Sequence, residues 1–318
     1  MLNRLIRFSL VSAFALAIAG HGVAIADSHE GGDDKTEEKT TEGGDDAEKK
    51  DGDGEEKKED GGGEEKKADD DAGSDDASAT SRKSVTKENY PTSLTGRPLV
   101  NPKGMIELGG AISHVRLSVA GISADATGLG VSASYVPADK IQVGLSTGLG
   151  IDPDVEWSES LGLSAWYSVM EEGMAGKLDV AAGVSTGLNF QDGADVFSGF
   201  TVHGLTRYHL GPKMFVTAGS NLLEVQTADP SALSLNIDLG FTYQATPKIA
   251  ATLTTRPAHI KLSGDANATT TYGDVIPLGI MGTMGMSAKL DVYAMLSFPS
   301  LEDAGDLMTI AVGARFRM

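Results

Sequence analysis

The carboxyl-terminal segment of the chain places the strongest constraint on its fold. From Met308 to Met318, apolar and polar residues alternate without a break. Such alternation predicts a β-strand with one apolar and one polar face that runs to the last residue. An exposed apolar strand with a free edge promotes aggregation in a soluble protein, whereas a closed membrane barrel pairs its last strand with its first. We therefore expect the chain to close into a β-barrel.

The region from Gly104 onward supports the same interpretation. It divides into segments of about 10 to 14 residues separated by turn residues, which is typical of tilted membrane strands. The sequence predicts an all-β fold, a closed up-and-down transmembrane antiparallel β-barrel of about 12 strands. The even number brings both ends of the barrel to one side of the membrane. The expected strands cover residues 104–119, 127–137, 140–151, 157–169, 177–190, 198–210, 214–225, 233–244, 248–262, 274–286, 289–298 and 307–318.

The first expected strand departs from simple alternation. It is apolar at every second residue from Ile106 to Ile112 and then, out of phase, from Val115 to Val119. This change of phase predicts a β-bulge near Ser113.

Aromatic residues gather near the ends of the expected strands, as they do at bilayer interfaces. One girdle is expected at the end that holds the termini, and comprises Tyr135, Tyr167, Tyr208, Phe215, Tyr243 and Phe316. The other is expected at the opposite, outer end, and comprises Trp157, Phe190, Phe200 and Phe298. The outer connections are short, so we expect no large cap or plugging loop.

The amino-terminal third has a different character. Residues 1–26 combine early arginines, an apolar run and small residues, the three zones of a secretory signal peptide. Residues 27–90 are a low-complexity arm in which acidic residues outnumber basic ones by about two to one. Such a segment buries too little apolar surface to fold, so we expect it to be disordered. Residues 91–318 then form the barrel domain.

The last six residues carry a more specific signal. Gly313, Phe316 and Met318 follow the spacing of glycine, two variable residues, a hydrophobic residue, a variable residue and a terminal hydrophobic residue. The segment resembles the carboxyl-terminal assembly signal of Gram-negative outer-membrane β-barrel proteins, a porin-like class. The resemblance implies a location in the outer membrane with the arm in the periplasm. It also implies contact with outer-membrane lipid, lipopolysaccharide and the barrel-assembly machinery, while any periplasmic partner of the arm stays unidentified.

Small residues dominate the expected inward face. A barrel of about twelve strands with such a lining is expected to leave free volume, which predicts a small passive pore for hydrophilic solutes or ions. The alternative is a flattened, closed barrel with a structural or adhesive role. The small inward residues are Gly130, Ser132, Ser134, Gly144, Ser146, Gly148, Gly162, Ser164, Gly183, Ser185, Gly279, Thr283 and Gly285.

A second inward set carries charge and supplies the candidate pore-lining residues. Closure of the barrel would bring the last strand, with its two arginines, near the glutamate of the first strand. The set forms either a network of compensating ion pairs or a basic constriction that tunes anion passage. Further basic residues, His114, Arg116, His203 and Arg256, are expected to extend this wall. The set at the end that holds the termini comprises Glu107, Lys177, Asp179, Arg207, His209, Arg315 and Arg317.

Other chemistry receives little support. His259 near Ser263 is the one histidine–hydroxyl pair at the outer rim, without a nucleophile motif, so an outer-membrane lipid hydrolase is a remote alternative. We assign no catalytic, cofactor or metal site and expect no enzyme. The chain has no cysteine, and its formal charge of -19 without a basic aromatic patch argues against nucleic acid as a partner. Acidic residues at the outer rim are expected to be solvated, and the alternative is that they bridge divalent cations to lipopolysaccharide or enrich cations at the mouth. They are Asp152, Asp154, Glu156, Asp192, Asp195, Asp229, Asp265, Glu302, Asp303 and Asp306.

Overall fold

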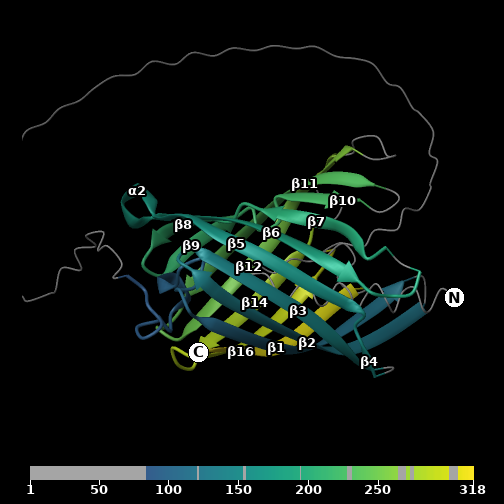
Figure 1. The fold of residues 1–318 in the computed structure, drawn as a ribbon, viewed down its shortest axis with the longest axis horizontal. Helices are drawn as coiled ribbons and strands as arrows, with labels where there is room; N and C mark the ends of the chain where they lie inside the picture. Colours follow the sequence, from purple (N-terminus) through teal and green to yellow (C-terminus); the bar gives the residue numbers. More distant parts are fainter. Residues whose placement is uncertain are drawn as a thin grey trace, which may run out of the picture. The chain divides into compact units, whose positions relative to one another are not determined.

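A computed structural model of the chain shows a closed antiparallel β-barrel of twelve strands (Figure 1). It describes residues 84–119, 122–152, 155–193, 195–227, 231–263, 270–272, 276–300 and 307–318. The expected signal peptide and most of the expected acidic arm lie outside these residues. Within the described ranges, no helix has the length and the apolar character needed to cross a membrane.

Strand segments are labelled as in Figure 1, and four of the twelve barrel strands consist of two segments each: β4 with β5, β7 with β8, β9 with β10, and β13 with β14. The segments are β1 (Ile106–Val119), β2 (Ile122–Ala138), β3 (Ile141–Asp152), β4 (Glu156–Trp157), β5 (Ser160–Glu172), β6 (Leu178–Asn189), β7 (Phe197–His203), β8 (Thr206–Gly211), β9 (Met214–Ala218), β10 (Leu223–Gln226), β11 (Ala232–Gln244), β12 (Ile249–Ser263), β13 (Thr270–Tyr272), β14 (Leu278–Gly285), β15 (Leu290–Phe298) and β16 (Leu307–Arg317). The two short helices are η1 (Leu94–Gly96) and α2 (Gly173–Gly176).

The barrel closes between its first and last strands. Glu107 of β1 lies opposite Arg317 of β16, and the pairing continues to Leu117 opposite Leu307. Beyond the end of the ladder, Ile106 and Met318 exchange two backbone hydrogen bonds of 2.9 Å. We call this the near end of the barrel and the opposite one the far end. The predicted closure is confirmed.

The barrel shows the inverse of the polarity of a soluble protein. On β11, Ile237 and Leu239 are 41% and 44% exposed, whereas Asn236 and Asp238, which alternate with them, are 0% and 8% exposed. Apolar side chains that face outward in a continuous band require an apolar solvent, and polar side chains that face inward require each other or water. The outer face is therefore suited to the hydrocarbon core of a bilayer.

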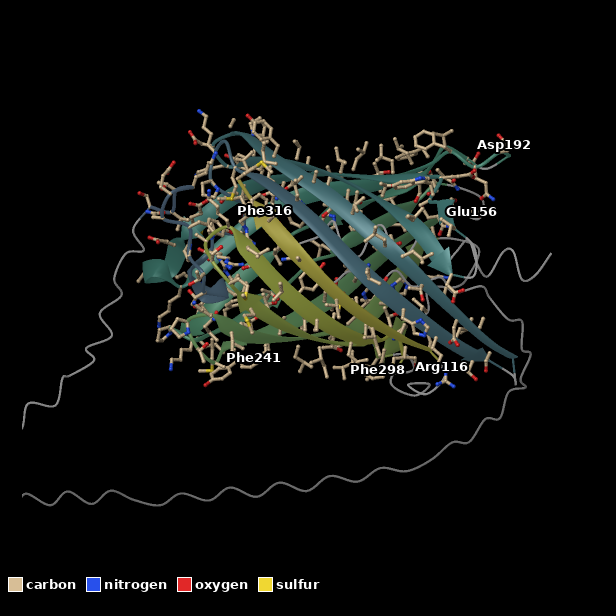
Figure 2. The ribbon with its side chains drawn as sticks, turned by 90° about the horizontal axis from the view of Figure 1, so that it is seen from below. Arg116, Glu156, Asp192, Phe241, Phe298 and Phe316 are labelled. Atoms are coloured by element: carbon tan, nitrogen blue, oxygen red, sulfur yellow. The ribbon has the colours of Figure 1, made fainter. Side chains whose placement is uncertain are left out.

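Aromatic residues mark the two ends of this outer face. Figure 2 shows Phe241 and Phe316 at the near end, and Phe298 with the charged Arg116 and Glu156 at the far end. The prediction that Phe215 belongs to the aromatic girdle is wrong. Its side chain is 8% exposed and faces the lumen, where its ring packs below the guanidinium of Arg207.

The predicted bulge near Ser113 is wrong. β1 pairs with both β2 and β16 in one continuous register, and Ser113 lies opposite Gly128 and Ala311 without a shift. The apparent change of phase has a different origin. Val115 faces inward and is 3% exposed, while the polar His114 and Arg116 face outward toward the far end.

A true irregularity lies in β12 instead. The register with β11 shifts between Ile237 opposite Ala258 and Leu239 opposite Thr255, so that Arg256 and Pro257 together face one residue of β11. Proline has no amide hydrogen for the ladder, and a bulge is a position that tolerates it. The bulge leaves Arg256 facing the lumen.

The near-end connections are short. β8 ends at Gly211 and β9 begins at Met214, while β11 ends at Gln244 and β12 begins at Ile249. At the far end, Asp152, Glu156, Asp192 and Asp195 are exposed. The other predicted acidic rim residues, Asp154, Asp229, Asp265, Glu302, Asp303 and Asp306, lie outside the described residues.

Candidate functional site

The lumen wall is built from glycine and serine residues that face each other across neighbouring strands. Gly144 lies opposite Ser164, and Gly162 lies opposite Ser146. A Cβ atom added to Gly144 would lie 2.7 Å from the hydroxyl of Ser164, and one added to Gly162 would meet the hydroxyl of Ser146. The side chain of each serine therefore occupies the space next to the glycine on the neighbouring strand. These positions of the inward face are therefore lined by small and polar side chains.

A charged cluster joins three strands at the near end. Arg317 of β16 donates 2.6 Å hydrogen bonds from Nε to Glu107 of β1 and from Nη2 to Asp291 of β15. Asp291 is 1% exposed and Arg317 3% exposed. Burial of unpaired charge is costly, so these contacts hold the carboxylates and the guanidinium in compensated positions.

A second cluster lies on the neighbouring strands β6 and β8. Arg207 donates from Nε and Nη2 to one oxygen of Asp179, at 3.0 and 2.7 Å. His209 Nε2 lies 3.2 Å from the same oxygen, and the backbone amide of Glu172 donates to the other oxygen. The carboxylate of Asp179 thus contacts two basic side chains and the backbone at the end of β5.

Polar contacts continue deeper into the lumen. Arg256 Nε donates to Asp238 at 2.7 Å, and the second oxygen of Asp238 accepts from the hydroxyl of Ser220. His203 stacks on Trp166 with ring centroids 4.7 Å apart, and its Nε2 lies 2.8 Å from the hydroxyl of Ser185. The inward face carries paired charge well beyond the near end.

The structure places most of the candidate pore-lining residues on the inward face. Arg315 also faces inward, with its guanidinium 5.1 Å from the centre of the Tyr293 ring. Lys177 is exposed at the near rim, in the connection that contains α2. His114 and Arg116 were wrongly expected inside, since both are exposed on the outer face of β1. The candidates on the inward face are Glu107, Asp179, Arg207, His209, Arg256, Arg315 and Arg317.

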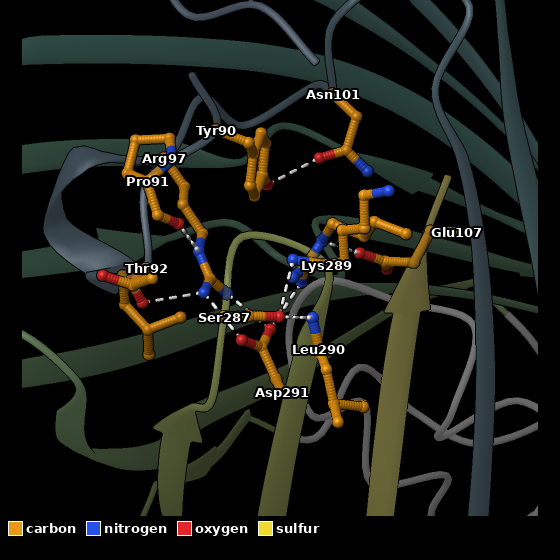
Figure 3. Close-up of polar contacts among 12 residues, drawn as sticks. Tyr90, Pro91, Thr92, Arg97, Asn101, Glu107, Ser287, Lys289, Leu290 and Asp291 are labelled. Atoms are coloured by element: carbon orange, nitrogen blue, oxygen red, sulfur yellow. Dashed lines mark hydrogen bonds and ion pairs between the residues drawn. The ribbon is translucent and has the colours of Figure 1, made fainter. Parts of the chain in front are cut away.

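Residues 90–103, which precede β1, occupy the near end of the lumen. We call residues 90–103 the lumenal segment. Arg97 binds Asp291 through both of its terminal nitrogens, at 2.6 and 2.8 Å (Figure 3). Tyr90 lies below the guanidiniums of Arg97 and Arg317, 5.5 and 4.9 Å from its ring centre, and donates a 2.7 Å hydrogen bond to Asn101. Tyr90 is 5% exposed, and its burial raises the pKa of its hydroxyl.

The lumenal segment also fills an apolar part of the wall. Val100, 3% exposed, packs with Trp166 of β5, Ala181 of β6 and Leu205 in one hydrophobic cluster, and Leu99 packs against it. Apolar side chains on a polar inward face are stable when another apolar group covers them. Val100 and Leu99 supply that cover.

Sequence reasoning missed the lumenal segment, although the wall carried a signal. Trp166 shares its inward phase in β5 with Gly162 and Ser164, where a water-filled lumen would favour a polar or small residue. A large apolar residue at such a position indicates that something inside the barrel covers it. Tyr90, the last residue of the expected arm, belongs to that covering segment.

The residues that resemble an assembly signal lie at the end of the barrel: Gly313 and Phe316 belong to β16, and Met318 follows it directly. Phe316 and Met318 are each 44% exposed on the outer face. Gly313 faces inward, and an added Cβ would meet the Tyr293 ring at 2.5 Å. The glycine is therefore required for the close approach of Tyr293, while the two apolar residues remain available on the outside.

The described residues give little support for a catalytic or a metal-binding site. His259 Nδ1 lies 2.6 Å from the amide oxygen of Asn236. Ser263 is four residues further along the same strand, a distance of about 13 Å, so the two do not form a nucleophile–base pair. Within the described ranges, no group of three or more histidine and carboxylate residues could hold a metal ion.

Comparison with known proteins identifies barrels of similar architecture. No protein-family model and no curated protein matches the sequence. Among solved structures, the KdgM porin shares 10% identity, with 65% of this chain and 98% of that chain covered and a TM-score of 0.43. The NanC porin shares 8% identity over 66% and 98%, with a TM-score of 0.47. The translocator domain of the autotransporter NalP from Neisseria meningitidis shares 14% over 69% and 90%, with a TM-score of 0.43.

The closed ring of twelve strands and the apolar outer face make this chain a β-barrel of the outer-membrane type. Its candidate functional site is the polar lumen, together with the lumenal segment at the near end.

Proposed function

We propose that the protein is a small passive pore of the outer membrane for hydrophilic solutes or ions. The observation that carries this proposal is the polar lumen, whose inward face carries small residues and charged residues behind an apolar outer face. Such a lining supports the passage of hydrated species.

The paired charges of the lumen favour a pore with weak selectivity between cations and anions. Its acidic residues Glu107, Asp179, Asp238 and Asp291 each bind an arginine at 2.6 to 2.7 Å. Compensated pairs present less net field to a passing ion than an unpaired ring of one sign. This favours the ion-pair network over a purely basic constriction.

Planar-bilayer conductance of the purified protein tests the proposal. We expect discrete, stable openings with low selectivity between potassium and chloride. A barrel of known closed structure, purified in the same detergent, provides the background. No openings above this background, in the wild type and in the variants of the next subsection alike, would overturn the pore.

A closed structural or adhesive barrel is the second candidate. The burial of Tyr90, Val100 and Asn101 at the near end favours it, because side chains from the chain itself fill that part of the lumen. The same recordings separate the two functions. Release of fatty acids from lipid by the purified protein would test the remote hydrolase alternative.

We propose that the near end faces the periplasm and the far end the exterior, in contact with lipopolysaccharide, and that the barrel-assembly machinery recognises the last strand. Asp195 and Lys213 are exposed at opposite ends, and the chain has no native cysteine. A cysteine at Asp195 should react with an impermeant thiol reagent on intact cells, and one at Lys213 should not. The reverse labelling would invert the orientation.

A further inference from the structure

The lumenal segment contacts the wall around most of the ring. Its partners come from β3, β5, β6, β8, β11, β15 and β16, and all face inward. Side-chain amides from opposite sides accept from its backbone: Leu94 N donates to Gln244 at 2.8 Å, and Asn101 N donates to Gln142 at 3.0 Å. The segment therefore spans the lumen at the near end and does not lie along one side of it.

Arg97 is the most highly connected residue of the segment. Its guanidinium holds the carboxylate of Asp291 with two bonds and donates to the carbonyl oxygens of Pro91 and Thr92 at 3.0 and 2.8 Å. Its own carbonyl oxygen accepts a 2.5 Å hydrogen bond from Arg207 on the other wall. Bidentate arginine–carboxylate pairs are strong and geometrically specific. Arg97 thus fixes the fold of the segment and its position in the lumen together.

The segment is attached to the wall differently from a strand. It contains one short helix, η1, and no strand, so within the described residues no β-ladder joins it to the wall. Its attachments are side-chain contacts, and segments held in this way open at a lower free energy than paired strands. Movement of the segment would leave the twelve-strand ring intact.

We propose that the lumenal segment is a plug that sets the size limit of the pore, and that the Arg97–Asp291 contact holds the plug in place. This inference rests on the proposed pore function. Arg97 is a positioning residue, since it acts by keeping Tyr90, Val100 and Asn101 in the lumen.

Substitution of Arg97 in the full-length protein tests the plug. Arg97→Gln removes the charge that binds Asp291, and we expect open probability to rise at least about tenfold, because loss of one partner of a buried pair is strongly destabilising. The largest neutral polymer that enters the pore should also increase in size. Arg116→Gln is the matched control, since Arg116 is exposed on the outer face, and it should conduct as the wild type does.

A crosslink tests whether movement of the plug causes the change. Asn101→Cys with Gln142→Cys, added to Arg97→Gln, places two cysteines in an otherwise cysteine-free chain where the native residues are in contact. A short bifunctional thiol reagent should join them in the folded protein and return open probability to the wild-type level. The same protein before crosslinking is the control, and titration of free thiols measures the reaction.

The outcomes separate the two proposals. If the wild type conducts and Arg97→Gln has the same open probability and polymer limit, the plug is refuted and the pore stands. Cysteines that fail to crosslink in the folded barrel, or a crosslinked protein that conducts as the uncrosslinked one does, also refute the plug. If neither the wild type nor any variant conducts, the proposed pore function itself is refuted.

Discussion

Asp291 and Arg97 should be strongly coupled in stability. Asp291 is the carboxylate that accepts from both Arg97 and Arg317, and it is 1% exposed. Asp291→Asn removes the negative charge and leaves two buried guanidiniums facing an amide. Arg317 retains Glu107, whereas Arg97 retains only carbonyl oxygens, so most of the loss falls on the lumenal segment.

The expected magnitudes follow from these contacts. Removing one partner of a buried ion pair costs about 3 to 5 kcal/mol, so Asp291→Asn and Arg97→Gln should each lower the free energy of unfolding by about that amount. The double variant should lose about 2 kcal/mol less than the sum, because the second change removes a contact that is already broken. Urea unfolding of the barrel in detergent measures these values. The fluorescence of Trp166, isolated by Trp157→Phe, reports on the lumenal segment because Trp166 packs against Val100.

A matched pair of variants provides the control. Asp238 pairs with Arg256 on the wall and not with the lumenal segment. Arg97→Gln and Asp238→Asn should therefore be additive to within about 0.5 kcal/mol. If the losses of unfolding free energy in Arg97→Gln and Asp291→Asn were additive to the same extent, the contact between Arg97 and Asp291 would contribute nothing to stability. That result would refute the reasoning.

Three further results are expected. Gly285→Ala should lower the free energy of unfolding by about 1 to 3 kcal/mol, since its new methyl group would meet the carbonyl oxygen of Thr92, whereas Gly282→Ala, with open space around it, should match the wild type in the same urea titration. Burial raises the pKa of Tyr90 above its ordinary value of 10.0, so the stability that its protonated hydroxyl contributes should be fully present below about pH 10 and be lost as the pH rises further, and Tyr90→Phe should remove this part of the pH dependence in melting experiments. Deletion of residues 316–318 removes part of the closing pair and should block assembly, and normal heat-modifiable migration of the truncated protein in gels would contradict this.

The strands were predictable because a membrane barrel has a simple rule of alternation. Each strand meets lipid on one side and the lumen on the other, so the period of two in residues 233–244 gives both the element and its outward face. Closure followed from the alternating terminal strand, whose free edge needs a partner, and it places Arg317 beside Glu107 as expected. The rule fails outside the hydrocarbon core. His114 and Arg116 are exposed on the outer face of β1, in its far half, and we expect an outward polar residue to cost less there than at the middle of the bilayer. Their polarity therefore wrongly suggested the lumen.

The lumenal segment could not be found in the same way. Residues 90–103 have no period of 2 or 3.6, and three prolines interrupt them. Their position depends on contacts with residues far away in the sequence, above all Asp291 and Arg207. The inward Trp166 indicates that something covers it, but pairing rules alone do not identify which segment does so.

The charged cluster around Asp291 also bears on how the barrel is completed. Arg317 and Glu107 bind across the junction of β16 and β1, the two strands that can meet only after the whole chain has been made. Through Asp291, the same cluster reaches Arg97 in the lumenal segment. Insertion of this segment and sealing of the junction should therefore favour each other, because each one positions a charge that the other needs. A barrel with the lumenal segment in place should resist lateral opening between β1 and β16 more strongly than a barrel without it.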